Sequence, residues 1–405
     1  MRPEDFTEVA GRVVRTPTGF WAFVPHPLPP ALAWSDDLVA TLSAAGLALG
    51  ELAGVGRLLP NPYLLIRPFM HQEAVFSSRI EGTRASLVDL YAHEAAVQLA
   101  LLKIPDDVQE VQNYIVALDY GLARLADLPV SLRLIREVHG QLLPGVRGQE
   151  WPAGEFRRSP NWIGPAGSTL ENAPYVPPPA PEMQQALHDL ELFLHAPPRL
   201  PALVRLGLFH VQFEMIHPFL DGNGRVGRLF LVLLLCSWRL LPQPLLYLSP
   251  YFEAHRQEYY DRLLGVSQRG EWAEWLAFFL AGVAQQAQET VRRIQRVQDL
   301  RERYRAQVQG ERASARLLQL VDALFARPVL TINQAAAALG VNYPIAQRHV
   351  ERLEALGMLR EITGRARNRA YRAGAVLAAI AEPLPEEAAP GPGPDQEEPP
   401  DAHSH

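Results

Sequence analysis

The chain has 405 residues, of which 48% are hydrophobic and 20% are charged, and its net charge is −6 with a pI near 6.1. This length and composition predict two or three domains with a sizeable core, and the mild acidity argues against general affinity for nucleic acids. The only cysteine, Cys236, excludes an internal disulfide and suits a reducing cytosol.

The N-terminus carries Glu4 and Asp5 and shows no apolar segment, so we expect no secretory signal. The longest apolar run falls short of the roughly 18 residues that span a bilayer, so we expect no membrane contact and a cytoplasmic protein. Lys103 is the only lysine, and arginine supplies nearly all of the positive charge. No arginine cluster is therefore distinctive by itself.

Residues 1–35 are rich in proline and aromatic side chains and are predicted to form an ordered arm on the body of the protein. Ser35 precedes two aspartates and an apolar series that continues to Leu52, which predicts an N-terminal cap and a helix.

A second helix is predicted from about Leu64 to Ile80, and it ends in a segment that contains Ser77, Glu81 and Gly82. Taken alone, this segment is an ordinary helix end with Gly82 as its C-terminal cap. Glu81 opposes the helix dipole at this position, so a cationic partner is expected for it.

Further helices are predicted over residues 108–125, 131–143 and 182–195. Proline and glycine exclude a long helix between the last two, and Asn161–Val176 is predicted to form a hairpin, for which an ordinary surface hairpin is the simpler interpretation. No histidine and cysteine cluster with zinc spacing occurs in the sequence.

Residues 217–228 read His-Pro-Phe-Leu-Asp-Gly-Asn-Gly-Arg-Val-Gly-Arg and separate two apolar helices that we expect to be buried. Gly222 and Gly224 lack Cβ atoms, so the backbone there is expected to take positive φ and approach a ligand closely. A helix that starts near Arg225 would point its free N–H groups at an anion. Arg225 and Arg228 share one face of its first turn and can bind phosphate oxygens.

The same loop carries a metal ligand and a base. Asp221 is an oxygen ligand of the kind that Mg²⁺ uses beside substrate phosphates, and His217 can accept a proton near neutral pH. Residues 222–224 alone would be an ordinary turn, but the whole ordered string indicates nucleotide phosphoryl chemistry.

Aromatic residues are dense from Leu245 to Ala284, and most are expected in the core. Tyr259 and Tyr260 point two ways around a helix, so one of them is a candidate for stacking on adenine.

The C-terminal third begins with an arginine-rich helix over residues 285–310 whose charge is expected to be a solvated face. Thr331 and Gln334 then form a capping box that opens a short helix, and a second helix begins near Asn342. A hairpin with an arginine-rich tip over residues 363–369 follows. The final segment, 382–405, holds many prolines and acidic residues and is expected to be disordered.

Residues 217–228 match, without departure, the signature of the Fic (filamentation induced by cyclic AMP) domain family, whose members typically transfer AMP from ATP to a protein hydroxyl. The resemblance implies that His217 deprotonates the target hydroxyl and that Asp221 holds Mg²⁺. It also implies that five residues of the loop contact the phosphates: Gly222, Asn223, Gly224, Arg225 and Arg228. Phe219 would pack beneath the loop.

Three further features resemble the same family. Ser77 and Glu81 are similar to the motif of its inhibitory helix, which implies a pair between Glu81 and Arg228 that blocks productive binding of the γ-phosphate. Asn161–Val176 would be the flap that aligns the target by strand addition. Residues 311–380 resemble a winged helix-turn-helix, with Gln347, Arg348 and the wing arginines available to DNA; protein docking or dimerisation is the alternative.

The resulting fold prediction is mostly α: an N-terminal helical region with the inhibitory helix (1–105), a Fic-type core with a β-hairpin flap (106–285), a connecting helix (286–310), a winged helix (311–380) and a disordered tail (381–405). The predicted function is Mg²⁺- and ATP-dependent AMP transfer to serine, threonine or tyrosine of a protein, the chain itself included, with homodimerisation compatible with the sequence.

Alternatives remain at this point. The chain could be a nucleotide-sensing regulator that binds DNA, or a Fic enzyme that moves another phosphoryl or nucleotidyl group or removes AMP.

Overall fold

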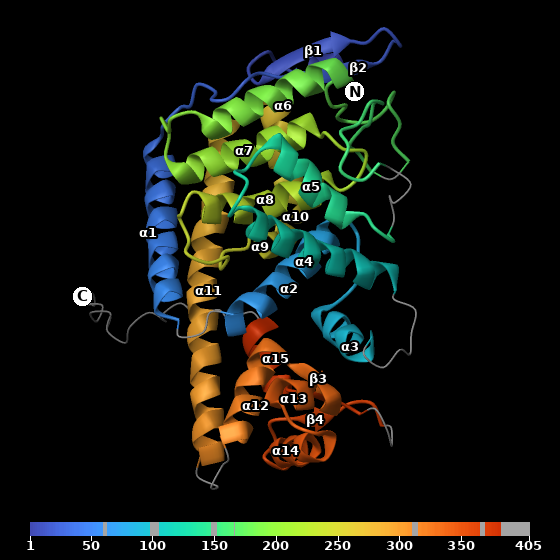
Figure 1. The fold of residues 1–405 in the computed structure, drawn as a ribbon. Coiled ribbons are helices and arrows are strands. Elements are labelled where there is room, and N and C mark those ends of the chain that lie inside the picture. The colour runs from blue at the N-terminus through green and yellow to red at the C-terminus, as the bar shows by residue number, and fades with distance from the viewer. Residues whose placement is uncertain are drawn as a thin grey trace, which may run out of the picture.

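The computed structural model describes residues 1–59, 63–97, 105–146, 152–165, 167–309, 315–364 and 369–381. The predicted wing tip and acidic tail lie largely outside these residues. The described part is mostly helical (Figure 1). Its N-terminal and central helices are α1 (Asp36–Leu58), α2 (Tyr63–Ile80), α3 (Leu87–Val97), α4 (Asp106–Arg124), α5 (Leu132–Leu142), α6 (Ala180–His195), α7 (Ala202–Ile216), α8 (Asn223–Ser237), α9 (Ser249–Ala254) and α10 (Arg256–Arg269).

The centre of the core is the pair α7 and α8. Every residue of α7 from Leu203 to Ile216 is buried, as are nearly all residues of α8. Helices that are apolar on every side are stable only when other elements surround them, and α2, α4, α6 and α10 pack around this pair. The polar loop that joins α7 to α8 therefore opens from the middle of the core.

The predicted helix boundaries are confirmed to within a few residues. The Oγ of Ser35 accepts a hydrogen bond from the N–H of Leu38 at 3.2 Å and caps α1. The Oγ of Ser131 caps α5 in the same way. The predicted connecting helix is not a separate element: it is the second half of α11 (Trp272–Gln309), which runs without a break from the core to the C-terminal domain.

Helix α1 lies along α11 (Figure 1). By length and composition it could cross a membrane, although an apolar helix of a soluble protein passes the same test. We had expected no such segment from the sequence. The difference arises because α1 has no charged residue between Asp37 and Glu51, and the leucine, valine, alanine and glycine residues there are interrupted only by Thr41 and Ser43, which break the apolar run but lower the hydropathy little.

The C-terminal domain comprises α12 (Ala315–Ala326), β3 (Val329–Thr331), α13 (Ile332–Leu339), α14 (Tyr343–Ala355), β4 (Arg360–Glu361), β5 (Ala370–Arg372) and α15 (Gly374–Ala381). Its strands form an antiparallel sheet in the order β3-β5-β4. The capping box of Thr331 and Gln334 is present, and the predicted winged helix-turn-helix is confirmed. The domain docks on α11 through Asp322, which accepts from Arg301 and Arg305 at 2.8 Å each.

Two segments differ from expectation. The N-terminal arm contains a short 3-10 turn (Pro3–Asp5) and a hairpin of β1 (Gly11–Arg15) and β2 (Trp21–Pro25), in which Gly11 pairs with Pro25. The N–H of Phe23 bonds to the carbonyl of Val176, so this hairpin borders the predicted flap. Within the described residues of the flap, strand pairing is limited to one antiparallel bridge, between Ile163 and Tyr175.

Candidate active site

His217 ends α7 in the left-handed backbone conformation, with φ 47° and ψ 62°. This conformation costs a non-glycine residue on the order of 1–2 kcal/mol, so the surroundings must hold it. Its N–H still bonds to the carbonyl of Phe213 at 2.9 Å, and its side chain is 19% exposed. The helix therefore delivers the imidazole to the edge of the core and then turns sharply into the loop.

Arg157 is the main support of this turn. Its guanidinium is buried and donates from Nε to the carbonyl of His217 at 2.9 Å and from Nη2 to the carbonyl of Pro178 at 2.6 Å. Asn161 donates to the carbonyl of Phe219 at 2.8 Å. Burial lowers the pKa of Arg157 to about 10, so the side chain stays charged at neutral pH. One cation thus ties the catalytic loop to the flap segment.

The loop is also fixed from below. Asn223 uses both ends of its amide on Phe219, accepting from the backbone N–H and donating to the carbonyl at 2.8 Å each. The ring of Phe219 stacks on His139, with centroids 3.7 Å apart. Nδ1 of His139 accepts from the N–H of Gly154 at 2.9 Å, so its Nε2–H donates to the carbonyl of Asp221 at 3.1 Å. Phe219 therefore lies beneath the loop as expected, and only the backbone of Asn223 is free to meet a phosphate.

The N-terminus of α8 has the form of an anion site. Gly222 has φ 79° and precedes the first turn. Gly224, in contrast to our expectation, has helical φ; a Cβ there would collide with Oε1 of Glu81 and lie 2.8 Å from Nη1 of Arg228. Its lack of a side chain therefore makes room for these two groups. Asp221 accepts the N–H of Gly222 at 2.7 Å and leaves its carboxylate 33% exposed.

Arg225 is 1% exposed, yet its Nε and Nη1 have no hydrogen-bond partner in the described structure. Two carboxylates balance its charge at 3.7 Å, those of Asp221 and Glu110. A buried guanidinium with open donors is costly unless a ligand completes it. The described residues include no cluster of three or more metal-ligand side chains. The partly exposed carboxylate of Asp221 is a ligand of the kind that Mg²⁺ can take together with phosphate oxygens and water.

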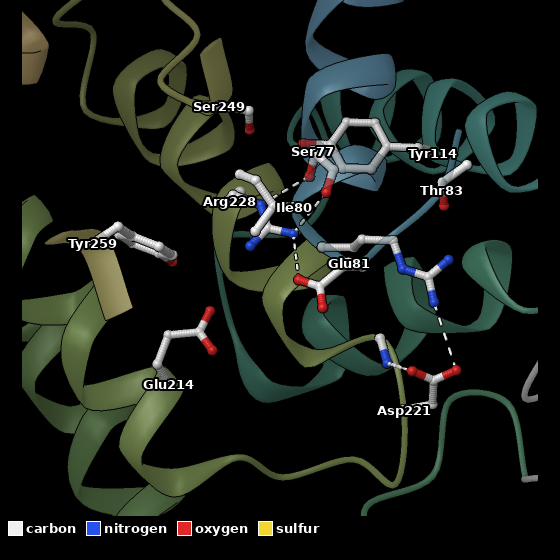
Figure 2. Close-up of polar contacts among 12 residues, drawn as sticks. Ser77, Ile80, Glu81, Thr83, Tyr114, Glu214, Asp221, Arg228, Ser249 and Tyr259 are labelled. Carbon is white, nitrogen blue, oxygen red and sulfur yellow. Dashed lines mark hydrogen bonds and ion pairs between the residues drawn. The ribbon is translucent and has the colours of Figure 1, made fainter. Parts of the chain in front are cut away.

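The segment that follows α2 closes over Arg228 (Figure 2). Arg228 is 2% exposed and donates from Nη2 to Oε1 of Glu81 at 2.7 Å. It also donates from Nε to the hydroxyl of Ser77 and from Nη2 to the carbonyl of Ser77, at 2.9 Å each. The predicted contact between Glu81 and Arg228 is therefore present, and Ser77 takes part through both its side chain and its backbone.

Charge keeps this pair ionised. Burial would raise the pKa of Glu81, but the charge and hydrogen bond of Arg228 outweigh it, and the pKa of Glu81 is lowered. Burial likewise opposes the charge of Arg228, whereas Glu81 raises the pKa of that guanidinium above its usual value. Such charge-assisted hydrogen bonds are about twice as strong as neutral ones.

The imidazole of His217 is neutral at physiological pH. Burial, with a smaller contribution from the charge of Arg157, lowers its pKa to about 4. The imidazole is therefore uncharged at neutral pH and has a lone pair that can accept a proton.

The two tyrosines lie in different environments. Tyr259 is 1% exposed, and its hydroxyl lies 2.7 Å from Nε2 of His210. Tyr260 is 38% exposed, and its hydroxyl donates to the carbonyl of Ile80 at 3.2 Å, at the end of α2. Only Tyr260 of the pair thus offers an accessible ring, and adenine stacking stays a prediction for it.

Sequence reasoning missed several residues that shape the site: Arg157, His139, Glu110 and Glu73. Glu73 is buried on α2 and accepts from the hydroxyls of Ser249 at 2.5 Å and Tyr114 at 3.1 Å. Arg157, His139 and Glu110 contact the 217–228 loop from distant positions in the sequence, and Glu73 connects α2 to residues that are equally distant. Their own neighbours carry no pattern that indicates this role.

Comparisons with known proteins agree with the geometry. Residues 39–123 match the N-terminal region of the Fic/DOC family, residues 129–235 match the Fic/DOC family itself, and residues 317–374 match a helix-turn-helix DNA-binding domain. The crystal structure of a Fic family protein from Desulfovibrio desulfuricans G20 has 20% sequence identity and a TM-score of 0.54, with 85% of this chain and 98% of that chain covered.

Among curated proteins, the protein adenylyltransferase Fic of Aedes aegypti is 29% identical over 201 residues, which are 47% of this chain and 36% of that protein. A probable protein adenylyltransferase of Aquifex aeolicus is 36% identical over 69 residues, 17% of this chain and 22% of that protein. The chain thus matches about a third of the length of the first of these relatives. With the loop geometry and the three matched regions together, the chain belongs to the Fic domain family and carries the family's N-terminal region and a C-terminal helix-turn-helix domain.

Proposed function

We propose that the protein transfers AMP from ATP to a hydroxyl side chain of a protein. The observation that carries this proposal is the neutral His217 beside the N-terminus of α8, where the buried Arg225 has open donors. The curated relatives named protein adenylyltransferase support the same activity.

The proposed step is an in-line displacement at the α-phosphorus of ATP. His217 takes the proton of the target hydroxyl while the hydroxyl oxygen bonds to phosphorus, and the bond to the bridging oxygen breaks so that pyrophosphate leaves. Arg225 offsets charge on that leaving group, because a preorganised cation is most effective where charge develops. An Mg²⁺ ion on Asp221 would supply further neutralisation of the phosphates.

We further propose that Glu81 holds the enzyme in an inhibited state. Its carboxylate occupies the same donor of Arg228 that a γ-phosphate would need. Because one N–H cannot satisfy two anions and two negative charges repel at this distance, Glu81 and a productively bound triphosphate exclude each other.

The test is transfer of label from α-labelled ATP with Mg²⁺, using wild type, Glu81→Gly and the double variant Glu81→Gly/His217→Ala, with intact mass as a second measurement. We expect label and the mass of AMP in Glu81→Gly, little in wild type and none in the double variant Glu81→Gly/His217→Ala. Nucleotide binding without label in Glu81→Gly would refute AMP transfer. Equal labelling of wild type and Glu81→Gly would refute inhibition while leaving transfer intact.

A second candidate function is DNA binding by the C-terminal domain, which the helix-turn-helix match favours. Arg348 and Arg352 are exposed on α14, the second helix of the motif, and this position suits contacts to phosphates or base edges. Helix α14 also carries Glu351 and Glu354, so its face is of mixed charge.

The test is a duplex-binding titration at several salt concentrations with wild type and Arg348→Ala. If the domain binds DNA, Arg348→Ala weakens binding and makes the salt dependence less steep. Binding that is absent at low salt would exclude this function.

A further inference from the structure

Glu214 is a buried carboxylate beside the base, and the proposed reaction gives it no role. It lies on α7 one helical turn before His217 and is 9% exposed. Its Oε2 is 3.9 Å from Nδ1 of His217. Within the described structure, Nδ1 of His217 and Oε1 of Glu214 both lack a hydrogen-bond partner. The unpartnered Nδ1 of His217 thus lies slightly beyond bonding distance of a carboxyl group that has a second, unpartnered oxygen.

The packing of α8 makes room for this carboxyl group. A Cβ at Gly227 would lie 2.6 Å from Oε1 of Glu214 and 3.2 Å from the ring of Phe213. Any side chain at position 227 would therefore push Glu214 from its place. Figure 2 shows the Glu214 carboxyl directed toward the side of the site on which Glu81 and Arg228 meet.

The charged and titratable groups around Glu214 come from four elements. They are His210 and His217 of α7, Arg228 of α8, Tyr259 of α10 and Glu81 after α2. Burial raises the pKa of Glu214 to about 7; Arg228 opposes this rise and Glu81 adds to it. His210 has a pKa of about 3 because of burial and is neutral. Near neutral pH, then, Glu214 can be present as the carboxylate, an acceptor-only group.

Resting on the proposed function, we propose that Glu214 is a positioning residue for the base. Its carboxylate accepts the Nδ1–H of His217, which leaves Nε2 free to take the proton of the target hydroxyl, and it offsets the positive charge of the imidazolium that forms. Hydrogen bonds of catalytic groups are often long in ligand-free structures and tighten in the complex.

The test uses Glu214→Gln and Glu214→Asp in the Glu81→Gly background, so that inhibition does not mask an effect on the base. Glutamine keeps the shape but cannot become an anion, whereas aspartate keeps the charge on a shorter stem. The control is Glu51→Gln, because Glu51 is exposed and lies on α1, away from the loop and the predicted flap. Thermal midpoints establish that each variant is folded.

Two measurements are made. We expect kcat of Glu214→Gln to fall about tenfold to a hundredfold with little change in KM for ATP, because orientation and charge of the base act in the transition state. We expect the nuclear magnetic resonance titration of the His217 imidazole to move to lower pH in Glu214→Gln, with more of the ring protonated at Nε2. Glu214→Asp should keep part of both properties, and Glu51→Gln should match the parent.

An unchanged kcat and an unchanged His217 titration in folded Glu214→Gln would overturn the inference. A lower thermal midpoint with an unchanged titration would show a purely structural role and overturn it as well. If Glu81→Gly transfers no AMP but the His217 titration responds to Glu214→Gln, the proposed function fails and the positioning role stands.

Discussion

The clamp formed by Arg157 makes the most direct prediction about the catalytic loop. Arg157→Met keeps most of the apolar stem and removes the guanidinium, so the carbonyls of His217 and Pro178 lose their donors. Hydrogen bonds to a charged group contribute about 1.5–3 kcal/mol each, so these two short bonds amount to roughly 3–6 kcal/mol. Removing a buried cation returns part of this, because its pKa of about 10 reflects costly burial. We expect a net loss of about 2–4 kcal/mol in the local stability of the loop and flap.

Hydrogen–deuterium exchange provides the assay, because it reports local opening directly. Backbone amides of residues 213–222 and 157–163 should exchange roughly 30- to 1,000-fold faster in Arg157→Met, which is what about 2–4 kcal/mol implies. The matched control is Arg158→Met, whose side chain is 90% exposed. Arg157→Lys should lie between them, because an ammonium group can reach one of the two carbonyls.

Exchange rates in Arg157→Met that equal those of Arg158→Met would refute the reasoning. They would mean that the left-handed conformation of His217 is held by the other contacts, such as the Phe213 bond and the bonds from Asn161 to the carbonyls of His217 and Phe219. AMP transfer by Arg157→Met in the Glu81→Gly background should fall as well, since the imidazole would lose its position.

Three further predictions concern α2 and its surroundings. Ser77→Ala removes the hydroxyl that accepts from Nε of Arg228, a bond that contributes about 1.5–3 kcal/mol to the stability of the inhibited arrangement. AMP transfer by this variant should therefore rise above that of wild type and stay below that of Glu81→Gly. Label transfer at or below the wild-type level would contradict this prediction. The pKa of Glu214 is raised from 4.5 to about 7, so the native state binds this proton more tightly than the unfolded state does. The resulting stabilisation is complete below about pH 4.5 and is lost as the pH rises through about 7. In urea denaturation, the difference in unfolding free energy between wild type and Glu214→Gln should therefore shift by up to about 3 kcal/mol over that window, and a difference that does not depend on pH would contradict this prediction. Ser249→Ala leaves Glu73 without its shortest hydrogen bond and should lower stability by about 1–3 kcal/mol in the same urea assay, whereas Ser43→Ala, on the exposed face of α1, should change it little.

Local patterns predicted much of the fold. Ser35 and the pair Thr331 and Gln334 each cap a helix as expected, because a cap depends on residues at most three positions apart. The apolar runs on both sides of His217 likewise predicted two buried helices. The contact between Glu81 and Arg228 spans 147 residues, and it was found only because both ends belong to motifs of one family.

Long-range contacts without a motif were not predictable in this way. Arg157 binds a carbonyl 60 residues away, and His139 binds one 82 residues away. Nothing in the neighbourhood of either residue indicates such a partner, since a carbonyl acceptor is present at every position of the chain. Gly224 illustrates the reverse error: its role is space for Glu81 rather than an unusual backbone angle.

The placement of α2 has a consequence for how the proposed inhibition ends. The helix is enclosed between α4, α8 and α9 on one side and α12 and α15 of the C-terminal domain on the other. Gln72 accepts from Arg293 at 2.6 Å, and Glu73 is held by Ser249, so the middle of α2 cannot leave without exposing the core. Release of Glu81 therefore takes the form of fraying of the last helical turn, next to Gly82 with its φ of 100°.

Fraying is an equilibrium, not a switch. With about 1.5–3 kcal/mol for the hydrogen bond between Arg228 and Glu81, the form in which this bond is open would be populated at roughly 0.6–7% in the absence of any signal. The basal rate of AMP transfer by wild type would then equal the Glu81→Gly rate multiplied by that open fraction. The stability of the end of α2 would set this basal rate. A ligand that stabilises the frayed end would raise activity in proportion, up to the limit that Glu81→Gly defines.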